Sequence, residues 1–223
     1  MEIIMHLETI DEQRIGLLNE LKKIDAIKMF SLGDGTGLSL QLGLRTSFDF
    51  DFFTDVHFST DKLLGDLKKV FGDELEIITR EDELATLDLY VKNIKVSFFE
   101  YRHKILAKPV PFDGFEPLSI LSIHDISAMK AIAIIQRGTK KDFFDVYFSI
   151  KNLNLSAAEL LSLIEAKYQD QNLKIRLLYS LAYFDDAEND VLPLSFVDYS
   201  WEEIKMFFIK FAKNVKKELD NGI

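Results

Sequence analysis

Residues 46–54 read TSFDFDFFT, and in this stretch aspartate and phenylalanine alternate strictly. A period of two predicts a β-strand over residues 48–53. Because side chains two residues apart project from one face of a strand, Asp49 and Asp51 are expected to point the same way. Phe48, Phe50 and Phe52 are expected to point the other way, into the core. Two neighbouring carboxylates repel each other, so a folded protein keeps them side by side only with a cation or a shared proton between them.

The cation that suits such a pair is Mg²⁺, which takes one or two protein carboxylates and leaves its other positions to water and phosphate. A metal ion that bridges the phosphates of a nucleotide polarises the phosphorus and stabilises the leaving group. The alternative is a solvated strand edge whose outer face is acidic and binds no ligand, because a short motif match is a hypothesis. The sequence therefore predicts Mg²⁺ on Asp49 and Asp51 and leaves the second interpretation open.

The segment just upstream, SLGDGT at residues 31–36, favours the metal interpretation. It predicts a strand, a glycine turn and a helix start, an arrangement that aims backbone N–H groups and the positive end of a helix at an anion. We expect Gly35 and Thr36 to contact phosphate there. A plain tight turn is the alternative explanation of the glycines.

Hydrophobic periodicity predicts the other elements of the first half of the chain. Helices are expected at 8–28, 38–44 and 60–71, a short strand at 29–32, and irregular structure at 108–117. Two β-rich runs, 87–91 and 94–99, are separated only by Lys92 and Asn93. This spacing predicts a hairpin with a two-residue turn, because asparagine tolerates the positive φ that such turns require.

The second half of the chain favours helices throughout. They are expected at 123–137, 141–150, 156–168, 173–184 and 200–219. The aromatic stripe from Phe143 to Phe148 is expected to pack between helices rather than to stack on bases. We therefore predict an α+β fold, in which a core domain with a mixed β-sheet spans residues 1–115 and an all-helical C-terminal domain spans residues 116–223.

The bulk composition limits the classes of function. The 223 residues carry a formal net charge of −10, whereas proteins that wrap duplex DNA usually present a basic field, so duplex DNA is not an expected partner. The chain contains no cysteine, which excludes thiolate metal sites and a cysteine nucleophile. No apolar run approaches the ~20 residues that span a bilayer, and the N-terminal segment does not resemble a signal peptide, so we expect a cytoplasmic protein without membrane contact.

Three segments of the chain carry a resemblance to a known family. Residues 31–54, SLGDGTGLSLQLGLRTSFDFDFFT, are similar to a signature segment close to GGTALALQLGHRxSxDxDFF. Residues 125–148, DISAMKAIAIIQRGTKKDFFDVYF, resemble the helical block that follows it, and residues 181–190, LAYFDDAEND, resemble a third segment. The family is that of the AbiEii/AbiGii toxin-like nucleotidyltransferases, and the resemblance covers the chain from about residue 25 to its C-terminus.

The resemblance implies a polymerase-β-like nucleotidyltransferase core followed by a helical region. It implies an enzyme that binds an NTP and Mg²⁺ and transfers a nucleoside monophosphate to an RNA (a tRNA end is attractive), a protein or a small-molecule acceptor. It also implies the toxin side of a toxin–antitoxin or phage-defence module, with an antitoxin protein as partner. Carried onto this chain, the site comprises Gly35, Thr36, Asp49 and Asp51 from the signature segment and Lys130, Arg137, Lys141, Asp142 and Asp145 from the helical block.

The residues of the helical block have two interpretations. Lys130, Arg137 and Lys141 suit the binding of a triphosphate, and Asp142 could orient or deprotonate an acceptor hydroxyl. Asp142 and Asp145 lie three residues apart and therefore share one face of a helix. The alternative is a structural network of salt bridges on adjacent turns, worth ~0.3–0.5 kcal/mol per exposed pair.

Three positions depart from the family pattern. Asp34 stands where the usual turn has glycine, and its carboxylate would repel phosphate unless it points away. Leu44 replaces a common histidine. Ser97 stands where relatives often carry a further carboxylate, and Glu100 is a poor substitute because its parity places it on the opposite face of the strand. A catalytically inactive homologue that binds a protein partner is therefore the alternative to the enzyme.

Overall fold

The computed structural model describes residues 4–222, and it divides the chain after Ser122 into two compact units. This division lies beyond residue 115, near which the change in sequence pattern predicts the boundary. Within the described residues, no helix is long and apolar enough to cross a membrane.

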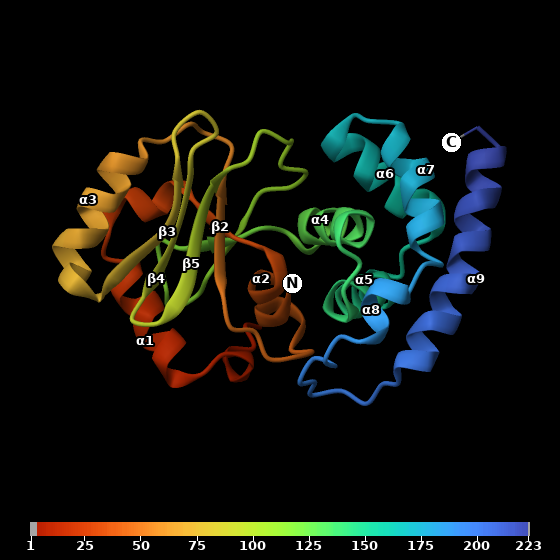
Figure 1. Ribbon diagram of the computed structural model, residues 1–223, viewed down its shortest axis with the longest axis horizontal. Helices are drawn as coiled ribbons and strands as arrows, with labels where there is room; N and C mark the ends of the chain where they lie inside the picture. Colours follow the sequence, from red (N-terminus) through yellow and green to blue (C-terminus); the bar gives the residue numbers. More distant parts are fainter. Residues whose placement is uncertain (1–3, 223) are drawn as a thin grey trace. The chain divides into compact units, whose positions relative to one another are not determined.

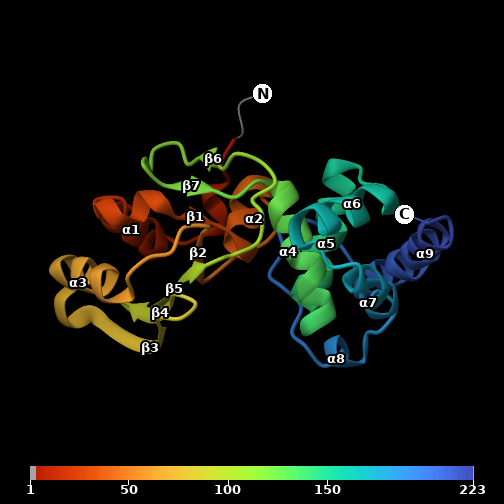
Figure 2. The same ribbon diagram turned by 90° about the horizontal axis from the view of Figure 1, so that it is seen from above.

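Within the described residues, the first unit is built on a seven-stranded mixed sheet with strand order β3-β4-β5-β2-β1-β7-β6. Figure 1 shows the part from β3 to β2, and Figure 2 labels all of the strands. β2 runs parallel to β5 and β1 runs parallel to β7, whereas the other neighbouring pairs are antiparallel. The strands are β1 (Ser31–Leu32), β2 (Phe50–Thr54), β3 (Leu75–Glu81), β4 (Thr86–Val91), β5 (Ile94–Glu100), β6 (Val110–Pro111) and β7 (Ser119–Ile120). The mixed sheet and the helices that accompany it confirm the predicted α+β class.

Helices cover both faces of this sheet. α1 (Glu12–Leu21) and α3 (Thr60–Phe71) lie on one face and α2 (Asp34–Leu42) lies on the other, as Figure 2 shows from above. Short 3₁₀ helices occur at Leu7–Thr9, Asp25–Met29 and Gly72–Glu74. The single helix expected over residues 8–28 is thus wrong in extent.

Local signals set the ends of these helices. The side chain of Asp11 accepts a hydrogen bond from the Arg14 N–H and starts α1, and Ser59 caps α3 in the same way through the Lys62 N–H. α2 begins earlier than the expected residue 38, and it ends before Gly43, whose φ of 65° is the left-handed conformation that favours glycine.

An aromatic core fills the space between the sheet and the helices α1 and α3. Phe50, Phe52 and Phe98 are fully buried, and the Phe52 and Phe98 rings stack with centroids 5.2 Å apart. The prediction that Phe48 enters this core is wrong, because β2 begins only at Phe50 and Phe48 remains 46% exposed. Phe48 lies instead against the guanidinium of Arg14, and its ring centroid is 5.1 Å from the central guanidinium carbon.

The predicted hairpin is confirmed in position and in turn type. Val91 pairs with Ile94, and both turn residues, Lys92 and Asn93, have positive φ values of 52° and 64°. This is the backbone that a two-residue turn with the right-handed twist of a hairpin requires. β3 was not expected, because most of its side chains are exposed on both faces and leave no alternation in the sequence.

The second unit is helical, as predicted. Its elements are α4 (Ile123–Gln136), α5 (Lys140–Leu153), α6 (Ala157–Tyr168), α7 (Asn172–Ser180), α8 (Asp185–Glu188) and α9 (Trp201–Asp220). α4 and α9 each contact α5, α6 and α7, so these helices share one core. The helix expected over 173–184 ends earlier, and α8 follows as a separate turn.

Aromatic side chains form the centre of the helical core. The ring of Phe143 lies 5.2 Å from that of Phe184, 5.7 Å from that of Trp201 and 5.2 Å from that of Phe208. Phe143 is fully buried. The prediction that this aromatic stripe packs between helices is confirmed.

Candidate functional site

The glycine bend, residues 33–36, joins β1 to α2 and is held against β2. The Gly33 N–H donates a hydrogen bond of 2.8 Å to the carbonyl oxygen of Asp51. A β-carbon on Gly33 would lie 2.7 Å from the Phe53 ring, so only glycine allows this approach. Since Phe53 and Asp51 have the same parity on β2, the bend lies at the face of the strand that carries Asp51.

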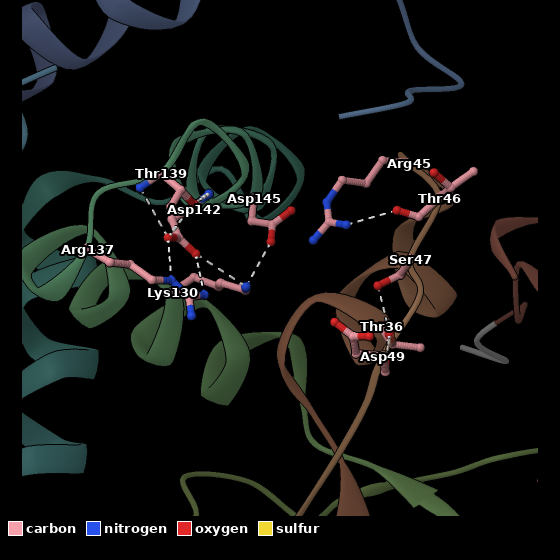
Figure 3. A network of polar contacts seen from close by, with 10 residues as sticks. All are labelled: Thr36, Arg45, Thr46, Ser47, Asp49, Lys130, Arg137, Thr139, Asp142 and Asp145. Carbon is pink, nitrogen blue, oxygen red and sulfur yellow. Dashed lines mark hydrogen bonds and ion pairs between the residues drawn. The ribbon is translucent and has the colours of Figure 1, made fainter. Parts of the chain in front are cut away.

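A second tether joins the bend to the other aspartate. The buried hydroxyl of Thr36 donates to the carbonyl oxygen of Asp49 and lies 2.7 Å from Ser47 Oγ (Figure 3). The backbones of Asp49 and Asp51 are therefore both fixed to the bend through hydrogen bonds. The structure thus brings together the four residues that the signature segment predicts.

Arg45 adds a positive charge to the bend. A β-carbon on Gly35 would lie 2.5 Å from Nη2 of Arg45, so the guanidinium packs directly over Gly35. Arg45 is only 4% exposed, and its Nη1 donates to the Thr46 carbonyl oxygen at 2.9 Å. The prediction of site residues omitted Arg45, although its position inside the signature segment is a signal that could have identified it.

The start of α2 completes an environment that attracts anions. The first N–H groups of a helix have no acceptor within the helix, and the positive end of its dipole lies there. Asp34, the first residue of α2, has a φ of 45°, a left-handed conformation that favours glycine and that aspartate tolerates better than most residues. This backbone requirement explains why the usual form of the signature has glycine at this position.

The two aspartates carry carboxylates of the kind that a divalent ion takes as ligands. Asp51 lies within β2 and is half-buried, and Asp49 directly precedes the strand and is exposed. In residues 4–222, no group of three or more histidine, aspartate or glutamate side chains could hold a metal ion. Two carboxylates fit Mg²⁺, which keeps several waters and takes substrate phosphate oxygens as its remaining ligands.

Glu100 does not extend this donor set. Its register on β5, opposite Thr54, places it on the other face of the sheet from Ser97, as its parity predicts. Hydrogen bonds of 2.7 Å from Arg102 and from His57 hold the carboxylate and lower its pKa to about 2. Glu100 is therefore engaged by its own neighbours.

The helical unit contains a buried network around Asp142 (Figure 3). Arg137 donates two hydrogen bonds, of 2.8 and 2.9 Å, to the two oxygens of this carboxylate. Buried Lys130 lies 3.5 Å from Asp142 and 3.2 Å from Asp145, and Thr139 donates its hydroxyl at 2.7 Å. The expectation that both aspartates share one face of a helix is confirmed by their common partner.

The partners of Asp142 determine its ionisation. Burial alone would raise the pKa of this fully buried carboxyl, but the hydrogen bonds from Arg137 and the charge of Lys130 outweigh it and lower the pKa to about 2. Asp142 also forms a capping box with Thr139 at the start of α5. Asp142 therefore positions Lys130 and Arg137, and the half-exposed side chain of Arg137 keeps contact with solvent.

The two lysines that start α5 have different environments. Lys141 is exposed. Lys140 is buried, and its Nζ donates to the carbonyl oxygens of Glu188 and Asp190 at 2.9 and 2.8 Å. The third segment of the resemblance, residues 181–190, thus anchors the start of α5 within the helical unit.

A pocket of about 750 Å³ lies in the first unit at the end of β2. Its lining includes Phe53, Ser31, Ser119 and the loop that carries Lys108. Ser31 Oγ and Ser119 Oγ form a hydrogen bond of 2.9 Å between β1 and β7. Gly35, Thr36, Asp49 and Asp51 are not among the residues that line this pocket.

Comparison with known proteins gives a consistent result. Residues 18–214 match the model of a family described as "Nucleotidyl transferase AbiEii toxin, Type IV TA system". An uncharacterized protein of Aquifex aeolicus (strain VF5) is 36% identical over 197 residues, which cover 86% of this chain and 89% of that protein.

Solved structures share the fold at lower sequence identity. JHP933 from Helicobacter pylori is 21% identical, covers 95% of each chain and has a TM-score of 0.55. The nucleotidyltransferase toxin MenT4 of Mycobacterium tuberculosis H37Rv is 13% identical, with 91% of this chain and 82% of that chain covered, and also has a TM-score of 0.55. These likenesses show the fold.

Proposed function

Because this chain belongs to the AbiEii family of nucleotidyltransferase toxins, we propose that it transfers a nucleoside monophosphate from an NTP to an acceptor at the glycine bend and the paired aspartates. The observation that carries this proposal is the pair of tethers between them. The Gly33 N–H binds the Asp51 carbonyl and the Thr36 hydroxyl binds the Asp49 carbonyl. A phosphate group on the bend would therefore lie beside the two carboxylates.

The residues of the bend bind the phosphates of the NTP. The N–H groups of Gly35 and Thr36, at the positive end of α2, donate hydrogen bonds to phosphate oxygens. The Arg45 guanidinium, packed over Gly35, adds a fixed positive charge that is suited to phosphate. The Thr36 hydroxyl is engaged with Asp49, so its contribution is to position the aspartate segment.

Asp49 and Asp51 hold Mg²⁺, which supplies charge neutralisation on the phosphates and polarises the phosphorus when it is bound. Both carboxylates come from one short segment whose backbone is fixed to the bend. Such preorganisation fixes the backbone that carries the donor oxygens before the substrate arrives, which reduces the reorganisation needed during the reaction. Loss of either carboxylate charge should therefore weaken nucleotide binding.

Lys130, Arg137 and Lys141 are proposed to neutralise the triphosphate, and Asp142, the residue of the helical block that is predicted to be catalytic, is proposed to orient these cations. The bonds of Asp142 with Arg137 and Lys130 favour a role in orienting these cations. A carboxylate with a pKa of about 2 is a weak base, so orientation suits it better than deprotonation.

Membership of the family supports proposals for the acceptor and the partners. We propose an RNA acceptor, with the end of a tRNA as the first candidate and a protein or a small molecule as the others. The structural neighbour MenT4 carries the description of a nucleotidyltransferase toxin. Toxin activity in a cell needs control, so we propose an antitoxin protein as partner, in a toxin–antitoxin or phage-defence module of the cytoplasm.

The experiment that tests the proposal is label transfer. Purified protein is incubated with Mg²⁺, each of the four NTPs labelled at the α-phosphate, and either total tRNA or a cell extract. Wild type should label a macromolecule, and Asp51→Asn should reduce the label by at least 100-fold, a loss within the range expected for removing a key electrostatic group. Equal labelling by both proteins would contradict the proposed site.

The inactive homologue is the second candidate, and Ser97 favours it because a hydroxyl replaces the carboxylate that relatives often carry. A protein that only binds a partner would show no labelling with any NTP. It would also show no Mg²⁺-dependent stabilisation by NTPs. The label-transfer experiment therefore distinguishes the enzyme from the binding protein.

A further inference from the structure

The register of the sheet places Asp51, Ser97 and Asp88 in one row across three neighbouring strands. Asp51 on β2 is paired with Ser97 on β5, and Ser97 is paired with Asp88 on β4. Paired residues on adjacent strands project from the same face of a sheet. The three side chains therefore share a face, and Gly33 continues the row on the far side of Asp51 through its hydrogen bond to the Asp51 carbonyl.

Two polar atoms of this row lack hydrogen-bond partners in the part of the chain that the structure describes. Ser97 Oγ and Asp88 Oδ1 are buried and have no partner within residues 4–222. Ser97 as a whole is 1% exposed. Leaving a buried polar group unsatisfied costs about 1–3 kcal/mol, so most such groups in proteins are paired. Two of them side by side, next to a proposed metal ligand, indicate a place where a ligand supplies the missing hydrogen bonds.

The hydrogen-bonding chemistry of Ser97 Oγ and Asp88 Oδ1 indicates which chemical group of a ligand would bind there. A carboxylate oxygen only accepts a hydrogen bond, whereas a serine hydroxyl both donates and accepts. A hydroxyl group that donates to Asp88 and accepts from Ser97 satisfies both atoms at once. An anionic phosphate would be repelled by Asp88, so the site suits the acceptor of the transfer rather than the nucleotide.

The direction of the row agrees with the geometry of phosphoryl transfer. The attacking oxygen and the leaving group lie roughly in line on opposite sides of the phosphorus. The leaving phosphates are proposed to lie at the bend, beside Gly33, and the metal at Asp51. The attacking hydroxyl then lies on the opposite side of Asp51, where the row continues to Ser97 and Asp88.

The distance between Asp88 and Asp51 excludes Asp88 as a ligand of the metal that Asp51 is proposed to bind. Neighbouring strands lie about 4.8 Å apart, so Asp88 and Asp51, two strands apart, are about 10 Å from each other at their backbones. This is too far for a compact ligand set, in agreement with the lack of any group of three candidate ligands in residues 4–222. It leaves room between the two carboxylates for a phosphorus and the attacking oxygen.

We propose that Asp88, assisted by Ser97, forms the acceptor end of the active site and receives the proton of the acceptor hydroxyl. The inference rests on the proposed function. The acceptor oxygen forms a bond to the α-phosphorus, and the bond from that phosphorus to the oxygen bridging to the β-phosphate breaks. Pyrophosphate leaves with the bonding electron pair, and the acceptor proton passes to the Asp88 carboxylate.

Other carboxylates fit this role less well. Glu100 lies on the opposite face of the sheet and is held by His57 and Arg102. Both oxygens of Asp142 already accept hydrogen bonds from Arg137. Asp88 has a buried oxygen that no described residue binds. Asp88 therefore fits the role best among these three carboxylates.

The first test separates catalysis from nucleotide binding. Asp88→Asn and Ser97→Ala are compared with wild type and with Asp73→Asn, a control at an exposed position outside the row. With labelled NTP and total tRNA, Asp88→Asn should lower kcat by about 100-fold, as expected for loss of a general base. Its KM for NTP and its calorimetric affinity for the Mg²⁺–NTP complex should stay within twofold of wild type, whereas Asp51→Asn should lose that affinity.

Stability provides a readout that does not depend on activity. Because Ser97 Oγ has no hydrogen-bond partner among the described residues, Ser97→Ala should leave Tm unchanged or raise it while transfer falls. A structural role of the row predicts the opposite, a lower Tm for Ser97→Ala, and that result would overturn the inference.

A rescue experiment tests the row itself. The double variant Asp88→Asn/Ser97→Asp moves the carboxylate one strand closer to Asp51 on the same face. Its transfer rate should be at least tenfold higher than that of Asp88→Asn. Transfer by Asp88→Asn at the wild-type rate would overturn the inference and leave the proposed function intact, whereas no transfer by wild type would overturn both.

Discussion

Asp142 is the shared partner of Arg137, Thr139 and Lys130 in the buried network of the helical unit. Its carboxylate accepts hydrogen bonds from Arg137 and lies beside buried Lys130. Asp142→Asn removes the negative charge that lies beside the buried Lys130 ammonium, so we expect a loss of about 3–5 kcal/mol in the free energy of unfolding. Urea unfolding followed by circular dichroism measures this loss.

The control for this variant is Asp198→Asn, at an exposed position of the same unit. It removes the same charge without touching the network and should change the free energy of unfolding by less than about 0.5 kcal/mol. Equal effects of the two substitutions would show that the network contributes nothing specific.

The same carboxylate predicts how stability depends on pH. The pKa of Asp142 falls from the ordinary value of 3.8 to about 2 on folding. A lowered pKa in the folded state contributes stability that is fully present above pH ~4 and is lost as pH falls towards 2, worth about 2 kcal/mol in total. Glu100 contributes in the same window, so the difference between wild type and Asp142→Asn isolates the Asp142 part. A difference that stays constant between pH 5 and pH 2 would contradict this assignment.

The glycine bend connects the other parts of the site, because it is hydrogen-bonded to the backbones of Asp49 and Asp51 and lies under Arg45. Gly35→Ala would place a β-carbon 2.5 Å from the Arg45 guanidinium and displace it from the start of α2. We expect at least a tenfold weaker affinity for the Mg²⁺–NTP complex, because the loss of one charge-assisted hydrogen bond to an anion costs about 1.5–3 kcal/mol. Calorimetric titration measures the change.

A glycine without close neighbours provides the matched control. Gly65 lies inside α3, and an added β-carbon there would meet no atom of residues 4–222 within 4 Å. Gly65→Ala should keep nucleotide affinity and raise the free energy of unfolding by about 0.5–1 kcal/mol, since alanine is the better helix former. If Gly65→Ala weakened nucleotide binding as much as Gly35→Ala, the role assigned to the bend would be wrong.

The β4–β5 hairpin depends on the backbone of its turn. Asn93 has a φ of 64°, which a β-branched residue adopts only with strain. Asn93→Val should lower the free energy of unfolding by about 1–2 kcal/mol, whereas Asn93→Gly should keep or raise it. Denaturant unfolding of the two variants checks the sign of each change.

How much of this could be predicted from sequence depends on how local each signal is. The turn at Lys92 and Asn93 identifies the hairpin, and pairing outward from it already sets Asp88 opposite Ser97. The segment that carries Asp49 and Asp51 and the glycine bend upstream are local patterns too, and the structure tethers them to each other as expected.

The features that were missed depend on contacts between distant segments. The parallel pairing of β2 with β5 brings Ser97 beside Asp51, and no spacing along the chain encodes it. The packing of Arg45 on Gly35 likewise depends on the path of the chain after α2. The exposed strand β3 has no hydrophobic period from which it could be recognised.

For the molecule as a whole, the two units have separate cores and carry different parts of the predicted site. The first unit holds the bend, the paired aspartates and the row that ends at Asp88. The second holds the network of Lys130, Arg137 and Asp142. Variants in one unit should therefore be tested for the fold of that unit before their effect on transfer is interpreted.

The central claim is that Asp49 and Asp51 hold the metal of an NTP beside the glycine bend. Its most direct test is the shift in Tm on adding each of the four NTPs, with Mg²⁺ or with EDTA. The proteins compared are wild type, the aspartate variant Asp49→Asn/Asp51→Asn and the control Asp73→Asn/Asp113→Asn. The control removes the same charge from exposed positions of the first unit. We predict that wild type and control rise with Mg²⁺ and at least one NTP and that the aspartate variant does not. A shift of equal size in the aspartate variant, or no shift in wild type with any NTP, would contradict the claim.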